Sequence, residues 1–160
     1  MLLAVAERVW DALVGCRLVR MSTASDDAPS SETVTQGIRV RVSCAFLPEH
    51  SVQDGPEAER RWAFSYTVTI TNEGRDAATL LARHWFITDG AGRVEQVRGP
   101  GVVGFQPALA DGQAFTYTSG AVLRTAHGTM HGTFLMERED GARFDANIAP
   151  FALVTPDHIQ

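Results

Sequence analysis

Residues 83–107 read RHWFITDGAGRVEQVRGPGVVGFQP, and they decide the fold that we expect for the rest of the chain. The stretch holds an aromatic-rich segment, a turn rich in glycine, a second extended segment and a cluster of glycines. A short connection that carries glycine between two extended segments is typical of a β-hairpin. The stretch therefore predicts two strands, over residues 79–89 and 93–98.

Alternation of apolar and polar residues extends this prediction along the chain. The clearest case is residues 61–71, where aromatic and β-branched residues alternate with small or polar ones. Further strands are expected over residues 38–42, 114–119, 129–138 and 142–151. About seven short strands with turns between them are the signature of an antiparallel sandwich. We therefore expect an all-β, immunoglobulin-like or fibronectin type III-like β-sandwich, with Trp85 in its core.

The chain is expected to divide into four parts. In residues 1–20 apolar side chains recur near helical spacing, so this extension is either a short amphipathic helix or the product of an upstream start, with translation beginning at Met21. Residues 21–32 lack aromatic and large aliphatic side chains, which predicts a flexible linker. The sandwich is expected over residues 33–154, followed by a tail at 155–160.

Composition narrows the classes of function. The 160 residues carry a net charge of -5, which does not favour a nucleic-acid partner. No apolar run of about 20 residues is present, so a membrane span is not expected. The cysteines Cys16 and Cys44 lie far apart in the sequence and offer no metal framework, which is typical of a reduced cytoplasmic protein.

The glycine cluster at residues 99–104 reads GPGVVG and matches the dinucleotide-binding fingerprint only as a string. That fingerprint needs a helix directly after the glycines, and Pro107 and the turn residues in 105–112 leave no room for one. Two alternatives stay open. Successive amides of the loop could form an anion site beside Arg98 and Arg83, or the glycines could simply let the chain cross between sheets.

The histidines do not predict a metal site or a catalytic site. His127 and His131 lie four residues apart, which in an extended strand is about 13 Å. Two nitrogens on one zinc ion must each lie about 2 Å from it, so these imidazoles could share an ion only if Gly128 made a turn. His84 is expected to be a hydrogen-bonded structural residue, and Ser119 has no local signature of a nucleophile.

Several separate motifs occur in an order that resembles the bacterial ApaG family. They lie in residues 37–49, 66–72, 80–89, 99–107, 117–120, 128–132 and 144–151. The resemblance covers about residues 33–154 and implies a fibronectin type III-like sandwich. The sequence departs from the family pattern in Phe105, where a charged or polar residue would be commoner, and in the two histidines at 127 and 131.

The resemblance implies two alternative functions. One is a non-enzymatic binding or interaction module that affects cobalt and magnesium efflux indirectly, since related domains in eukaryotes look like interaction modules. The other is a protein or small enzyme that binds a phosphate or pyrophosphate ligand, with or without a divalent cation. For that ligand the resemblance implies Gly99, Gly101 and Gly104 as binding residues, with Arg98 and Arg83 beside them. The sequence predicts neither a catalytic residue nor the oligomeric state.

Overall fold

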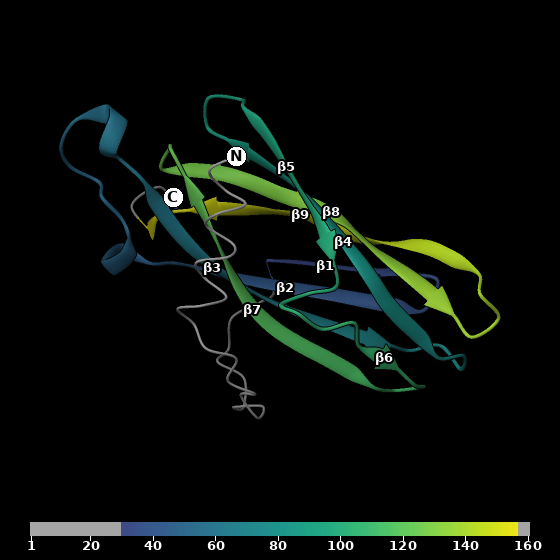
Figure 1. The fold of residues 1–160 in the computed structure, drawn as a ribbon. Helices are drawn as coiled ribbons and strands as arrows, with labels where there is room; N and C mark the ends of the chain where they lie inside the picture. The colour runs from purple at the N-terminus through teal and green to yellow at the C-terminus, as the bar shows by residue number, and fades with distance from the viewer. Residues whose placement is uncertain (1–29, 157–160) are drawn as a thin grey trace.

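The structure is a computed structural model that describes residues 30–156, and it consists of two antiparallel β-sheets packed face to face (Figure 1). The four-stranded sheet has the order β1-β2-β3-β7, with β1 (Ser31–Thr35), β2 (Ile38–Phe46), β3 (Trp62–Asn72) and β7 (Ala114–Leu123). The five-stranded sheet has the order β5-β4-β8-β9, with β6 paired to β4. Its strands are β4 (Ala78–Asp89), β5 (Val94–Pro100), β6 (Ala108–Leu109), β8 (His127–Arg138) and β9 (Arg143–Val154).

Two short 3₁₀ helices, η1 (Pro48–His50) and η2 (Glu57–Glu59), lie in the connection between β2 and β3. Across the described residues, neither of these nor any other helix has the length and apolar character needed to cross a membrane.

The predicted antiparallel sandwich is confirmed, and every strand expected from the alternation pattern is present. The structure adds two short strands, β1 and β6, and extends β7 by four residues beyond the predicted end at Ser119. β1 begins at Ser31, inside the segment predicted to be a linker. Its one large aliphatic residue, Val34, is exposed, so the strand carries no buried alternation that a sequence pattern could reveal.

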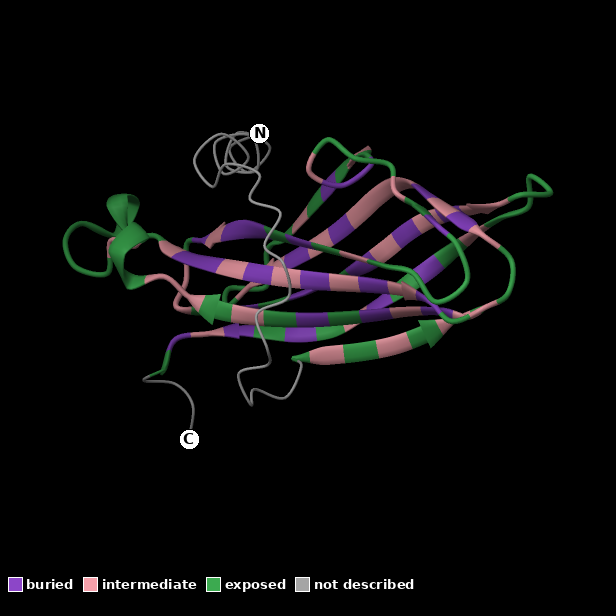
Figure 2. Cartoon of the chain, turned by 90° about the horizontal axis from the view of Figure 1, so that it is seen from below, coloured by how far each residue is buried: buried purple, intermediate pink, exposed green. Residues whose placement is uncertain are grey.

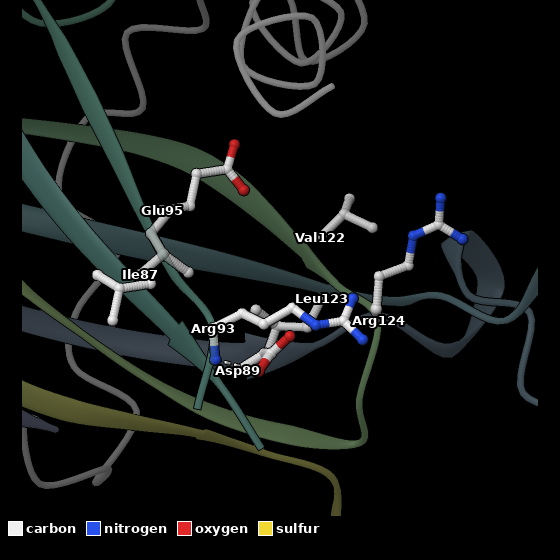
Figure 3. A pocket seen from close by; sticks show the side chains of 8 residues that line it. Ile87, Asp89, Arg93, Glu95, Val122, Leu123 and Arg124 are labelled. Atoms are coloured by element: carbon white, nitrogen blue, oxygen red, sulfur yellow. Dashed lines mark hydrogen bonds between the residues drawn. The ribbon is translucent and has the colours of Figure 1, made fainter. Parts of the chain in front are cut away.

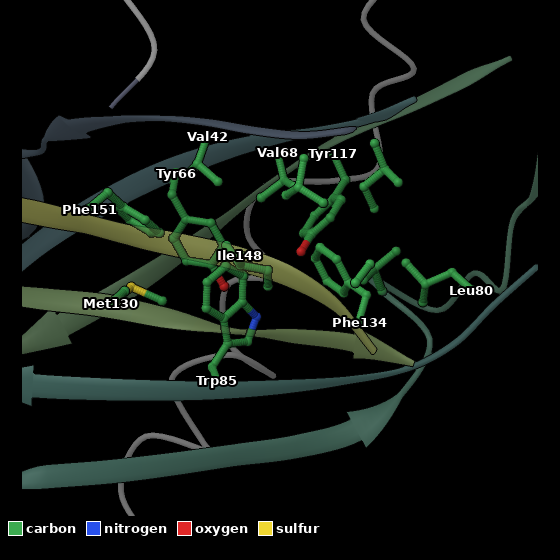
Figure 4. Packing of buried hydrophobic residues seen from close by; sticks show 14 of the residues in the cluster. Val42, Tyr66, Val68, Leu80, Trp85, Tyr117, Met130, Phe134, Ile148 and Phe151 are labelled. Atoms are coloured by element: carbon green, nitrogen blue, oxygen red, sulfur yellow. The ribbon is translucent and has the colours of Figure 1, made fainter. Parts of the chain in front are cut away.

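The core lies between the two sheets and is built from the inward-facing residues of each strand. Buried and exposed residues alternate along the strands, as the bands in Figure 2 show. Trp85 is 1% exposed, which confirms its predicted core position. Its ring lies 5.2 Å from that of Tyr66 and meets Phe134 and Phe151 edge-on at 6.0 and 6.1 Å (Figure 4). Such edge-to-face contacts add to the free energy gained by aromatic burial.

The two sides of the sandwich differ. On one side β9 lies against β1 and β2. The Asn147 amide of β9 donates to Thr35 Oγ1 of β1 at 3.1 Å, and the Cys44 thiol of β2 donates to the Ala152 carbonyl of β9 at 3.2 Å. Pro150 lies in β9, an outer strand, as the need for a sheet edge predicted. On the opposite side the outer strands are β5 and β7, each paired to one neighbouring strand. The candidate site lies on this second side.

Candidate functional site

The glycine cluster forms a tight hairpin at the end of β5. The Gly101 amide donates to the Leu81 carbonyl at 2.8 Å, which holds the chain against β4 as it leaves the sheet. Val102 and Phe105 then exchange two backbone hydrogen bonds, each 2.8 Å long. The two residues between them, Val103 and Gly104, have φ values of 43° and 84°. Positive φ at both central residues defines the two-residue turn that favours β-hairpins.

The glycines of this hairpin serve different steric needs. A Cβ atom on Gly101 would lie 2.3 Å from the Phe105 carbonyl oxygen, so a side chain cannot fit there without moving the backbone. A Cβ atom on Gly104 would meet nothing within 4 Å. On Gly99 it would lie 2.8 Å from the Arg83 guanidinium. Gly101 and Gly99 therefore permit close packing, whereas Gly104 mainly supplies a left-handed backbone conformation.

Most amides of the hairpin are hydrogen-bonded inside the protein. Those of Gly101, Val102 and Phe105 donate to carbonyl oxygens, and Val102 is fully buried. Within residues 30–156 no acceptor lies on the amides of Val103 and Gly104, at the exposed end of the turn. An anion nest needs several amides that converge on one point. The loop therefore leaves two amides available to an anion, and its hydrogen-bonded amides are used inside the protein.

The two arginines expected beside the loop point to opposite faces of the five-stranded sheet. Arg83 of β4 pairs with Gly99 of β5 and lies on the same inward face of the strand as the buried Trp85. Its Nη1 donates to the carbonyls of Pro100 and Gly101, at 3.1 Å each. Arg98 is exposed on the other face, where its Nε donates to His84 Nε2 at 3.2 Å. The structure thus brings Arg83 to the carbonyl oxygens of the loop and does not bring the two guanidinium groups together.

An aromatic row lies on the outer face of the same sheet, around Arg98. The rings of His84 and Phe86 are 4.3 Å apart, and those of Phe86 and His131 are stacked at 5.0 Å. His84 Nε2 also lies 3.0 Å from Gln96 Oε1. His84 is therefore hydrogen-bonded, as expected. His127 and His131 lie on one extended strand, β8. No group of three histidine, cysteine or acidic residues that could hold a metal ion occurs in the described part of the chain.

A cleft opens between β5 and β7 on the second side of the sandwich (Figure 3). Its volume is about 310 Å³, near the lower limit for a small-molecule pocket. It is lined by Ile87, Asp89, Arg93, Val94, Glu95, Val122, Leu123 and Arg124. Figure 3 shows Arg93 extending across the cleft toward Leu123.

Two of the polar groups that line this cleft are held by the backbone. Asp89 Oδ1 accepts from the amides of Ala91 and Arg93, at 2.9 Å each, and Arg124 Nη1 donates to the Ala58 carbonyl at 2.6 Å. Sequence reasoning did not find the cleft, because its walls come from the β4–β5 turn and the end of β7, and no local pattern joins those segments.

The fold and the hairpin together define a class of protein: a small antiparallel β-sandwich with a glycine hairpin at the end of an outer strand. A sequence model of the ApaG domain matches residues 52–138, which is more than half of the chain. The chain belongs to the ApaG domain family.

Relatives and solved structures support this assignment. The chain is 50% identical over 126 residues to Protein ApaG of Aromatoleum aromaticum, and the match covers 79% of this chain and 96% of the relative. It is 55% identical over 119 residues to Protein ApaG of Ectopseudomonas mendocina, with coverage of 74% and 91%. An X-ray structure of a structural genomics target has a TM-score of 0.72, 44% identity, and coverage of 78% of this chain and 91% of that one.

Proposed function

We propose that this chain is a non-enzymatic binding module that recognises a protein partner. The observation that carries the proposal is the hydrogen bonding of the glycine hairpin. The amides of Gly101, Val102 and Phe105 donate inside the protein, and Arg83 donates to carbonyl oxygens of the same loop. These contacts are those of a structural turn. They favour a loop that shapes the surface of the sandwich over a loop whose amides hold a small ligand.

An effect on cobalt and magnesium efflux would follow from such binding in the cytoplasm. The protein would act on the cellular content of these ions through its partner, since the described residues hold neither a helix that could cross a membrane nor a cluster of metal-ligating side chains. In cells that lack the gene, we expect altered cobalt tolerance that expression of the chain restores. The purified protein should show no heat of cobalt or magnesium binding in calorimetry. Direct binding of either ion would contradict this route.

The second candidate is a phosphate or pyrophosphate ligand at Gly99, Gly101 and Gly104, with a divalent cation bridging the phosphates. The amides of Val103 and Gly104 favour it, because both lie at the open end of the turn and have no acceptor within residues 30–156. Arg98 and Arg83 would have to leave their present partners to reach such a ligand.

A thermal-shift screen separates the two functions. The full chain is heated with pyrophosphate, ATP, ADP and diadenosine polyphosphates, each with and without magnesium or cobalt. A ligand at a hundredfold its dissociation constant would stabilise the protein by about 2.7 kcal/mol, which such a screen detects. The binding-module proposal predicts no shift.

A matched pair of variants makes a positive result informative. Gly101→Val is unsuitable because its side chain would strike the Phe105 carbonyl. Gly104→Asp and Gly104→Asn instead place side chains of equal size where a Cβ atom meets nothing, and they share the cost of positive φ. A shift that Gly104→Asn keeps and Gly104→Asp loses would establish the phosphate ligand and overturn the proposal.

A further inference from the structure

Among the described residues, the outer strand β7 differs from β1, β5 and β9 in carrying no residue that blocks a further strand. Natural sheets protect their outer strands with charge, proline, bulges or short length. Such residues are Glu32 in the short β1, Glu95, Arg98 and Pro100 in β5, and Arg143, Asp145 and Pro150 in β9. β7 reads AFTYTSGAVL over ten residues, with no charge, no proline and no register shift against β3.

The pairing of β7 with β3 shows which backbone groups point outward. The Asn72 amide donates to the Gln113 carbonyl at 2.9 Å, one step beyond the pair of Thr71 with Ala114. Hydrogen-bonded and non-hydrogen-bonded pairs alternate in an antiparallel ladder, so Ala114, Thr116 and Thr118 belong to non-hydrogen-bonded pairs. Their N–H and C=O groups therefore point away from β3.

The threonine hydroxyls agree with this assignment. Side chains come closest in non-hydrogen-bonded pairs. The hydroxyls of Thr69 and Thr116 lie 3.0 Å apart, and those of Thr67 and Thr118 lie 2.9 Å apart. Ala114, Thr116 and Thr118 are all exposed, and within residues 30–156 β7 pairs with β3 alone. Gly120, farther along the strand, is buried, so the open edge is the first half of β7.

The glycine hairpin places an apolar side chain beside this open edge. Phe105 is 46% exposed, and its ring lies 6.0 Å from that of Phe115, on the inward-facing side of β7. The ring of Phe115 in turn lies beside that of Tyr117, with ring centroids 6.3 Å apart. An exposed phenylalanine next to unpaired backbone groups combines an apolar anchor with a set of hydrogen-bonding groups.

We propose that the first half of β7, with Phe105 beside it, binds an extended peptide segment of a partner protein by strand addition. Outward N–H and C=O dipoles alternate along this edge, and an extended backbone is the chemical group whose own dipoles match them in sign and spacing. The peptide places a large apolar side chain on Phe105 and Phe115. The inference rests on the proposed binding function and adds the surface and the binding mode.

The test uses the full chain labelled with ¹⁵N and decapeptides selected from a random phage-displayed library. We expect at least one selected peptide, made synthetically, to shift the amide resonances of Ala114, Thr116 and Thr118 and to slow their hydrogen exchange. N-methylation at every second peptide residue should weaken binding roughly tenfold, because each methyl group removes one ladder hydrogen bond and obstructs the pairing. N-methylation at the intervening residues should have little effect.

Protein variants provide the matching control. Thr118→Pro removes an outward N–H while leaving the β3 ladder its donors, so affinity should fall roughly tenfold. Thr118→Val loses the same hydroxyl but keeps the N–H, so it should bind like the parent chain. Phe105→Ala should also weaken binding roughly tenfold, as expected for an aromatic anchor. If Thr118→Pro fails to fold, the N-methyl series still decides the question.

Three results would overturn the inference. One is a library that yields no peptide able to bind the chain. Another is a bound peptide whose shifts map to the cleft or to the aromatic row on the outer face, which would leave the binding-module proposal standing without this edge. The last is a concentration-dependent dimer that Thr118→Pro abolishes, since the edge would then pair with a second copy of the chain.

Discussion

At the scale of single residues, Gly101 and Gly104 have different reasons to be glycine, and alanine substitution should separate them. Both have positive φ, which costs alanine about 1 kcal/mol. Only at Gly101 would the added Cβ atom strike a backbone oxygen. We expect Gly101→Ala to lower the free energy of unfolding by about 3 kcal/mol and Gly104→Ala by about 1 kcal/mol. Urea unfolding of the two variants measures the difference, and equal losses would contradict the close approach to Phe105.

Asn72 is a polar residue whose buried side chain is hydrogen-bonded to the backbone. It is fully buried, its Nδ2 donates to the carbonyls of Asp76 and Leu109 at 2.8 and 2.9 Å, and its Oδ1 accepts from the Gly74 amide at 3.0 Å. Asn72→Ala removes the acceptor of the Gly74 amide and one donor from each of the two carbonyls, of which that of Asp76 still accepts from Arg138.

We therefore expect Asn72→Ala to lower the free energy of unfolding by about 2 to 3 kcal/mol. Asn147→Ala, at an exposed position on β9, should change it by less than about 0.5 kcal/mol. Thermal or urea unfolding of both variants checks this. A small effect of Asn72→Ala would show that water replaces the side chain.

At the scale of elements, β1 is tied to its sheet by charge as well as by pairing. Arg39 of β2 forms ion pairs with Glu32 of β1 and with Glu73 in the β3–β4 turn. The hydrogen bond from Arg39 lowers the pKa of Glu73 below its usual 4.5. A lowered folded-state pKa contributes stability above the unfolded-state pKa, and this contribution disappears as the pH falls through the folded-state value.

Glu73→Gln should therefore be less stable than the parent chain at neutral pH and equally stable well below pH 4.5. The difference should be small, because these side chains are exposed to solvent. Urea midpoints of both proteins across this pH range test the prediction. A gap that persists in acid would mean that Glu73 acts through something other than its charge.

The elements differ in how far the sequence predicts them. β3 was predictable because aromatic and β-branched side chains occupy every inward position from Trp62 to Ile70, so the sequence pattern matches the burial pattern there. β1 was not, because its residues are polar apart from Val34 and its place in the sheet comes from its pairing with β2. β7 runs past Ser119 through Gly120, which in isolation favours a turn and here continues the ladder with β3.

The candidate site was predictable only in part. The glycine string predicted a loop after β5, and the turn residues that follow it argued against a dinucleotide fingerprint. The internal hydrogen bonds of Gly101 and Val102 were not predictable, because they depend on β4 and on the hairpin geometry. The opposite directions of Arg83 and Arg98 depend on the phase of two strands relative to the core. The backbone N–H and C=O groups of β7 that point outward can be identified only once its register with β3 is known.

At the scale of the whole molecule, the buried apolar core of residues 30–156 extends from Ile38 to Leu153. The extension predicted over residues 1–20, residues 21–29 of the predicted linker and residues 157–160 of the predicted tail lie outside the described residues. Because the two sheets bury their apolar faces against each other, removal of residues 1–29 should leave a domain that unfolds cooperatively. Circular dichroism during urea unfolding checks this. Loss of cooperative unfolding would mean that the preceding segment completes the core.

The central claim is that the glycine hairpin is a structural turn whose donors are used inside the protein. Amide hydrogen exchange of the full chain, followed by NMR, tests it most directly. We predict slow exchange at Gly101, Val102 and Phe105, whose amides are hydrogen-bonded, and fast exchange at Val103 and Gly104. The claim would be contradicted if the first three amides exchanged as fast as Gly104 and became protected when pyrophosphate and magnesium were added.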